Sequence, residues 1–221
     1  MSIHTNQYEF IYSPSYWLAP LSYYACLLLI DKPIFFEAHE NYQKRSYRNR
    51  GYILGTNGPL LLSVPLQKGK NQQTPISRVN ISNEIGWKRD HLRSIMSAYG
   101  SAPFYDYYMP KIKKIYSSNE ARLIEWNKTW YLFFKEHLQL SQDYQETKTF
   151  MKFSTVPFIN LELELKQDFL SNLNYNDSFW YPQVFAERFP FQNNLSILDI
   201  LFCCGPESSI LLKQYWINNH L

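Results

Sequence analysis

The sequence lacks the short motifs by which many enzymes are recognised. It contains only 7 glycines in 221 residues, and none belongs to a P-loop, a GxGxxG turn or a GxSxG nucleophile turn. An HExxH pair and a DxD-like acidic pair are also missing. These absences argue against a P-loop kinase, a simple dehydrogenase, an α/β hydrolase and a zinc protease, and weakly against a metal-dependent glycosyltransferase. The sequence therefore identifies neither a cofactor nor a set of metal ligands.

Cysteine is scarce and poorly placed for cross-linking. Of the 3 cysteines, Cys26 lies in an apolar run, while Cys203 and Cys204 are adjacent. No pair has a CxxC or zinc-ligand spacing. This usage favours a reducing compartment over a secreted domain held together by disulfides.

Long apolar runs are absent as well. The longest, residues 25–30, is far shorter than the roughly 20 residues of a membrane-spanning helix. The N-terminal residues show no cationic segment followed by an apolar one, as a signal peptide would. We therefore expect a cytoplasmic protein without a membrane span.

The composition is that of a folded protein with an excess of aromatic residues. A hydrophobic fraction of 45% excludes disorder, and an aromatic fraction of 18% is more than a core requires. Most of the excess comes from 18 tyrosines, which can form apolar surfaces that also donate hydrogen bonds. A formal net charge of +3 disfavours nucleic acid as a partner. Nothing in the sequence determines the oligomeric state.

The first forty residues have the pattern of a parallel crossover unit. Residues 8–12 alternate as in a strand, residues 21–30 form an apolar helix started by Pro20, and residues 33–37 form a second strand. Strand, helix and strand in this order indicate a βαβ-like unit. Ligands of such sheets bind at the carboxyl ends of the strands.

A β-hairpin and several helices complete the predicted fold. Asn57 and Gly58, between apolar segments at 51–54 and 60–66, are typical of a hairpin turn. Beyond the hairpin, apolar residues recur with helical spacing. This spacing predicts helices near residues 83–99, 104–115, 119–140, 195–202 and 207–216.

These elements predict one α/β domain over residues 1–221. Its N-terminal part, residues 1–82, holds the βαβ-like unit and the β-hairpin. Its C-terminal part, residues 83–221, is mainly helical. No internal repeat or low-complexity segment divides the chain.

The most distinctive stretch is residues 39–50, directly after the second predicted strand. It holds four of the 22 lysines and arginines and no aliphatic side chain. If it is extended, alternate side chains share one face; if it is helical, Lys44 and Arg48 share one. Fork-shaped donors suit phosphate or carboxylate, although a solvated basic rim paired with Glu37 and Glu40 would explain the same residues. The residues that we expect to bind an anionic ligand are Tyr42, Lys44, Ser46, Arg48, Asn49 and Arg50.

This interpretation makes a prediction about two of the arginines. Arg48→Ala and Arg50→Ala should each weaken ligand binding without a large loss of stability. A large fall in melting temperature would instead show that the arginines are structural.

Two histidines are candidates for the catalytic transfer of a proton. His39 lies beside Glu40 at a strand end, where a carboxylate can adjust the pKa of an imidazole, although a surface histidine at a turn is the simpler reading. His91 shares a helical stripe with Trp87 and Ile95, which also suits a core residue with satisfied hydrogen bonds.

Aromatic residues also surround Gly100. Among them, Tyr99 and Tyr108 could form walls with hydroxyl tips, which suit a sugar or a base. Packing of two helices around a tight turn is the alternative. We include both tyrosines among the candidate binding residues.

Several separated segments together resemble the WbqC-like protein family. They are the basic run at 42–50, the strand at 62–66 that contains Pro65, Trp87 with His91, the aromatic segment 99–108 and the C-terminal segment 195–207. Many members carry an Asp-x-Gln-Tyr run before the central tyrosine. This chain has His39 and Asn41 at those positions, so the resemblance does not carry over a mechanism based on aspartate.

The resemblance implies a function in bacterial surface polysaccharide assembly. It implies a group transfer, of an aminoacyl or acyl unit, onto a nucleotide-activated sugar. Our first hypothesis is a cytoplasmic transferase whose partner is a phosphorylated or nucleotide-linked small molecule. The alternative is a non-catalytic binding or scaffold protein of the same assembly. RNA binding is a remote third, since it would require more positive charge.

Overall fold

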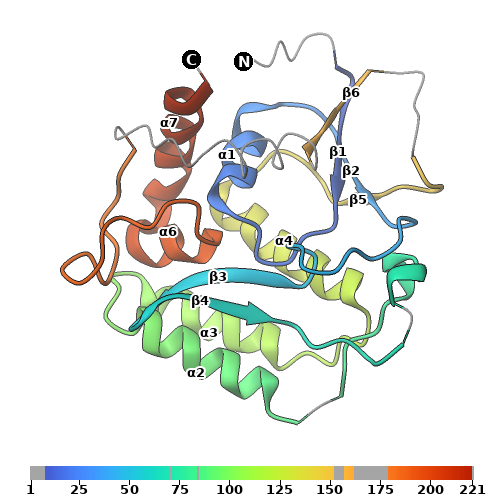
Figure 1. Ribbon diagram of the computed structural model, residues 1–221. Coiled ribbons are helices and arrows are strands. Elements are labelled where there is room, and N and C mark those ends of the chain that lie inside the picture. The colour runs from blue at the N-terminus through green and yellow to red at the C-terminus, as the bar shows by residue number, and fades with distance from the viewer. Residues whose placement is uncertain (1–7, 70, 84, 152–156, 162–178, 221) are drawn as a thin grey trace.

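The computed structural model of this chain describes residues 8–69, 71–83, 85–151, 157–161 and 179–220. Its N-terminal part contains β1 (Phe10–Pro14), α1 (Leu21–Leu29) and β2 (Ile34–Glu37), with the two strands parallel. This is the predicted βαβ-like unit, and the α/β class is confirmed (Figure 1).

The parallel sheet has four strands in the order β5-β2-β1-β6. The outer strands, β5 (Gln145–Glu146) and β6 (Phe158–Asn160), are parallel to their neighbours. Most side chains of β1 and β2 are buried, as expected for central strands covered on both faces. The C-terminal part of the chain therefore completes the sheet that the N-terminal part begins.

The predicted hairpin is present as a separate two-stranded sheet. It pairs β3 (Arg50–Gly55) with β4 (Gly58–Ser63) in antiparallel register, so that Thr56 and Asn57 form the connecting loop. Gly58 opens β4 with a φ of 105°, which is costly for any residue with a Cβ. The glycine is thus required by the turn.

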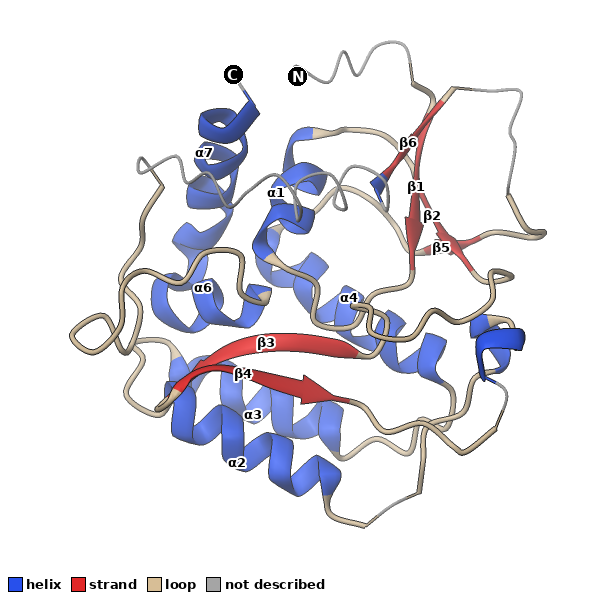
Figure 2. Cartoon of the chain, viewed as in Figure 1, coloured by secondary structure: helices blue, strands red, loops and turns tan. Residues whose placement is uncertain are grey.

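The remaining chain is mainly helical, as predicted (Figure 2). The first of its helices begins at Trp87, after Gly86, and not at residue 83. Short 3₁₀ turns lie at η2 (Asn71–Gln73), η3 (Ile76–Arg78) and η4 (Gly205–Glu207). Among the described residues of this part, the α-helices are α2 (Trp87–Tyr99), α3 (Tyr105–Tyr116), α4 (Leu123–Leu138), α6 (Ile197–Cys204) and α7 (Ser208–His220).

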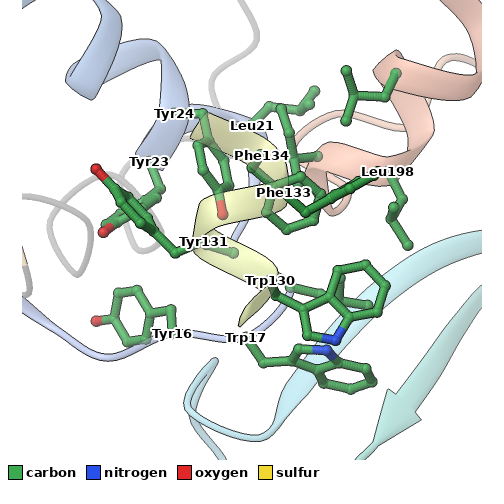
Figure 3. Close-up of a cluster of buried hydrophobic side chains, with 14 of the residues drawn as sticks. Tyr16, Trp17, Leu21, Tyr23, Tyr24, Trp130, Tyr131, Phe133, Phe134 and Leu198 are labelled. Carbon is green, nitrogen blue, oxygen red and sulfur yellow. The ribbon is translucent and has the colours of Figure 1, made fainter. Parts of the chain in front are cut away.

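An aromatic core around α4 joins the two parts of the chain. Trp17, from the loop after β1, lies edge-to-face on Trp130 of α4 with 6.2 Å between ring centroids. Tyr24 of α1 meets Phe134 of α4 in the same way at 5.2 Å. Figure 3 shows side chains of α1, α4 and α6 converging here. These packed rings account for the high aromatic content, because each buries a large area with few rotatable bonds.

No helix within the described parts of the chain combines the length and apolar character needed to cross a bilayer.

Gly51→Ala should destabilise the protein, because β3 packs closely against the loop after β1. A Cβ at Gly51 would lie 2.4 Å from Cβ and 2.9 Å from the carbonyl oxygen of Leu18. Relieving such overlap in a packed core costs about 1–3 kcal/mol. Chemical denaturation should show this loss, whereas Thr56→Ala in the exposed hairpin turn should change the free energy of unfolding by less than about 0.5 kcal/mol. Equal stability of Gly51→Ala and the unmodified chain would contradict the packing.

Candidate functional site: a polar cleft beside the parallel sheet

A cleft of about 520 Å³ lies near the carboxyl ends of β1 and β2. This volume falls within the range usual for small-molecule sites. Its position is the one expected for ligands of open parallel sheets. The cleft is lined by Tyr12, Glu40, Asn41, Tyr42, Gln43, Lys44, Gln72 and Phe150.

The basic stretch that forms one wall is neither extended nor helical. It passes through consecutive turns from Lys44 to Asn49, and Arg45 adopts a left-handed φ of 58°. Both geometries considered for the sequence are therefore wrong for this segment. As a result its side chains separate: Tyr42, Arg48 and Asn49 are buried, while Lys44 and Arg45 are exposed.

Arg48 forms a buried ion pair with Glu40. Its Nε and one terminal nitrogen donate to the two carboxylate oxygens at 2.8 and 2.6 Å, and the arginine side chain is only 1% exposed. The guanidinium also lies over the ring of Tyr16, 5.8 Å from its centroid. Glu40 thus pairs with a basic residue, as expected for a basic rim, but the pair is buried and not solvated. This ion pair holds the two ends of the turn together.

Tyr42 and Asn49 form a second buried link across the stretch. The Tyr42 hydroxyl donates to Oδ1 of Asn49 at 2.7 Å, and Nδ2 of Asn49 donates to the Val64 carbonyl oxygen at 2.9 Å. Burial raises the pKa of Tyr42, and the charges of Arg50 and Arg48 partly oppose this increase. The hydroxyl therefore stays protonated and acts as a donor.

The remaining candidates of the stretch differ in exposure. Lys44 is exposed in the cleft wall, and no carboxylate of the described residues lies within ion-pair distance of it. Ser46 directs its hydroxyl back to the carbonyl oxygen of Gln43 at 2.7 Å. Arg50 is half-buried at the start of β3. Of these three, Lys44 is the one that lines the cleft.

His39 lies just beyond β2, above a fully buried carboxylate. Glu37 accepts hydrogen bonds from the His39 backbone at 2.7 Å, the Thr147 hydroxyl at 2.9 Å and the Met151 backbone at 3.0 Å. The Nε2 atom of His39 lies 3.0 Å from the Thr147 carbonyl oxygen. Because a carbonyl oxygen only accepts, Nε2 carries a proton, and in the neutral imidazole the lone pair is then on Nδ1. His39 is exposed, two residues before the cleft residue Asn41.

The structure does not bring His91 to His39. His91 stacks on Trp17 with 5.3 Å between ring centroids, and its Nδ1 lies 3.1 Å from the Tyr116 hydroxyl. It is 7% exposed, and burial lowers its pKa to about 4, although contacts with the Ser63 backbone and Asp90 oppose this. His91 is therefore neutral at pH 7 and packed within the aromatic core.

Tyr99 and Tyr108 also lie in the core and do not line the cleft. The Tyr99 hydroxyl donates to Asp199 at 2.9 Å, and the Tyr108 ring lies edge-to-face on Phe202 with 6.1 Å between ring centroids. Burial raises the pKa of Tyr108 to about 12. Both tyrosines therefore pack in the core, which was the alternative to a role in binding.

Six residues of the cleft wall were not among the predicted site residues. Tyr12 could have been found, because it lies near the carboxyl end of the first predicted strand. Glu40, Asn41 and Gln43 could also have been found, because they belong to the distinctive stretch at residues 39–50. Gln72 and Phe150 carry no such signal, since they reach the cleft only through the folding of later segments.

Comparison with known protein families gives one match, over residues 15–168, to the WbqC-like protein family. The chain belongs to this family. The matched region of this WbqC-like protein includes the cleft residues from Glu40 to Phe150 and the helices α2, α3 and α4. No curated protein and no solved structure matches the chain.

Within the described ranges, no three His, Cys, Asp or Glu side chains come together in an arrangement that could hold a metal ion.

Removal of the Glu40 carboxylate should destabilise the protein, because it takes away the negative charge that balances the buried Arg48 guanidinium. Glu40→Ala should lower the free energy of unfolding by about 3–5 kcal/mol, measured by urea denaturation. Because Arg48 is buried in the same ion pair, Arg48→Ala should also lower the stability, contrary to the prediction made from the sequence.

Two variants test this account of the ion pair. The double substitution Glu40→Leu and Arg48→Met should recover most of the loss, since apolar residues of similar size often replace a buried pair at little cost. Lys44→Ala removes an exposed cation from the same stretch and should change stability by less than about 0.5 kcal/mol. A loss below about 1 kcal/mol for Glu40→Ala would contradict a desolvated pair.

His91 should make stability depend on pH in a defined window. Between pH 6.5 and about 4, the unfolded chain binds a proton at His91 that the folded chain does not, so stability falls as the pH falls. At about 1.4 kcal/mol for each pKa unit, the loss from this residue is about 3 kcal/mol. Denaturation at pH 7 and pH 4 should show a smaller difference for His91→Gln than for the unmodified chain. Equal differences would refute the depressed pKa.

Proposed function

We propose that this protein is a cytoplasmic transferase that binds a phosphorylated or nucleotide-activated sugar in the cleft beside the parallel sheet. The observation that carries the proposal is Lys44, a cation exposed in the wall of a cleft of about 520 Å³ and without a carboxylate partner among the described residues. Glu40, the other charged residue of this wall, is neutralised by its ion pair with Arg48, which is buried behind it. Among the described lining residues, Lys44 is therefore left as the uncompensated charge.

The other lining residues suit a sugar or a nucleoside. Gln43, Gln72 and Asn41 carry carboxamides, which both donate and accept hydrogen bonds, as hydroxyl groups require. Tyr12 and Phe150 supply aromatic faces. A phosphate on Lys44 and a ring against these faces is the ligand that this combination favours.

His39 is the residue that we assign to proton transfer. The acceptor hydroxyl or amine gives its proton to Nδ1 of His39 as its oxygen or nitrogen bonds to the acyl carbon. The leaving group departs from that carbon with the electrons of the broken bond. The contact of Nε2 with the Thr147 carbonyl oxygen supports this role, because it fixes the tautomer that leaves Nδ1 available. His91 is packed in the aromatic core, so we do not assign the step to it.

Family membership supports the biological context. The chain belongs to the WbqC-like family, and its resemblance to that family implies surface polysaccharide biosynthesis, with transfer of an aminoacyl or acyl unit onto the sugar. The proposed reaction class is supported by this implication. The proposed anionic ligand is supported by the lining of the cleft.

Lys44→Ala should abolish most of the stabilisation by an anionic ligand. The test is a thermal-shift panel of nucleotide sugars, nucleoside phosphates, coenzyme A and inorganic phosphate at low and moderate salt. A ligand at a hundred times its dissociation constant stabilises the folded state by about 2.7 kcal/mol. Loss of one charge-assisted hydrogen bond removes about 1.5–3 kcal/mol of binding free energy.

Lys68→Ala is the matched control, because Lys68 is exposed but does not line the cleft. It should keep the ligand-induced shift. If no compound raises the melting temperature of the unmodified chain, the non-catalytic scaffold hypothesis is preferred.

A further inference from the structure

Two clefts meet at Lys44 and Gln72. Both residues line the larger cleft beside the sheet, and both also line a second cleft of about 290 Å³. The remaining walls of the second cleft come from Gly69, Asn71 and Gln73. The cation therefore stands between two compartments and not at the end of one.

The larger compartment is the aromatic one. Phe150 is 51% exposed in its wall, and its ring packs on no other aromatic ring of the described residues. An exposed apolar ring beside a cation is typical of a platform on which a nucleobase stacks. Tyr12 and Tyr42 extend the same wall.

The smaller compartment has no aromatic residue in its lining. Gln72 and Gln73 are exposed, and within the described chain neither side chain forms a hydrogen bond. The side-chain nitrogen of Asn71 donates to the Gln67 carbonyl oxygen at 2.9 Å, which leaves its own oxygen as an acceptor. Such paired donors and acceptors match the hydroxyl groups of a sugar.

We infer that the two clefts together bind a nucleoside diphosphate sugar. The diphosphate lies on Lys44, the base stacks on Phe150, and the sugar hydroxyls contact Gln72 and Gln73. The charge of this ligand lies in its middle with a neutral group on each side, as does Lys44 between the clefts. A sugar phosphate carries its charge at one end and fills a single compartment. The inference rests on the proposed function and selects one of its two substrate classes.

Isothermal titration calorimetry on the full chain tests the inference. The probes are sugars linked to UDP, GDP, ADP and dTDP, together with each nucleoside diphosphate and each sugar 1-phosphate alone. The best nucleotide sugar should bind at least about tenfold more tightly than either of its halves, because it occupies both compartments.

Two substitutions should separate the compartments. Phe150→Ala should weaken the nucleoside diphosphate about tenfold to a hundredfold and leave the sugar 1-phosphate unchanged, while Phe150→Tyr keeps the stacking and the affinity. Gln73→Ala should weaken the sugar 1-phosphate and leave the nucleoside diphosphate unchanged. Lys44→Ala should weaken all three.

The outcomes distinguish this inference from the function on which it rests. If a sugar 1-phosphate binds as tightly as every nucleotide sugar, or if Phe150→Ala leaves the affinity for the nucleoside diphosphate intact, the two-compartment ligand is wrong and the anion-binding cleft stands. If none of the probes binds, or if Lys44→Ala changes no affinity, both proposals fail.

Discussion

The buried pair of Glu40 and Arg48 is the interaction on which the cleft depends. It closes the turn that carries the chain from the parallel sheet to the hairpin. The backbone of the same turn is fixed from outside, because Asn127 of α4 donates to the carbonyl oxygens of both Arg48 and Ser15 at 2.9 Å. One carboxamide thus ties the residue after β1, the turn and α4 together, and Lys44 lies in the segment that these hydrogen bonds hold.

Pairing within the turn also determines the electrostatics of the site. The charge of Arg48 is already neutralised by Glu40 in the free protein, so Arg48 supports the conformation of the turn but adds no net charge to the site. A buried cation without its carboxylate would be far more costly than the pair. The attraction for an anion is left to Lys44, which is solvated in the free protein and loses little when it exchanges water for phosphate oxygens.

Much of the fold followed from short-range patterns, and the arrangement of the cleft did not. Alternating and apolar runs identify β1, α1 and β2, and the Asn-Gly sequence identifies the hairpin. The strands β5 and β6 have two and three residues, too few for a period to show. The composition of residues 39–50 marks a polar site, but the burial of Arg48 depends on turns that return it to Glu40, eight positions earlier. His91 lies in the core, as its position on an apolar face of the helix indicated. Phe150 approaches the cleft only through tertiary structure.

The parallel sheet has a consequence for how the chain folds during synthesis. Phe10 of β1 pairs with Phe158 of β6, and β2 pairs with β5. The outer edges of β1 and β2 can therefore pair only after residues much later in the chain have been synthesised. Contacts between such distant positions slow folding, because loop closure precedes any gain from pairing. Until the later segment leaves the ribosome, β1 and β2 have unsatisfied backbone groups at their outer edges, which makes the nascent N-terminal part prone to aggregation. The sheet beside the cleft is thus completed only after residues 145–160 have been made.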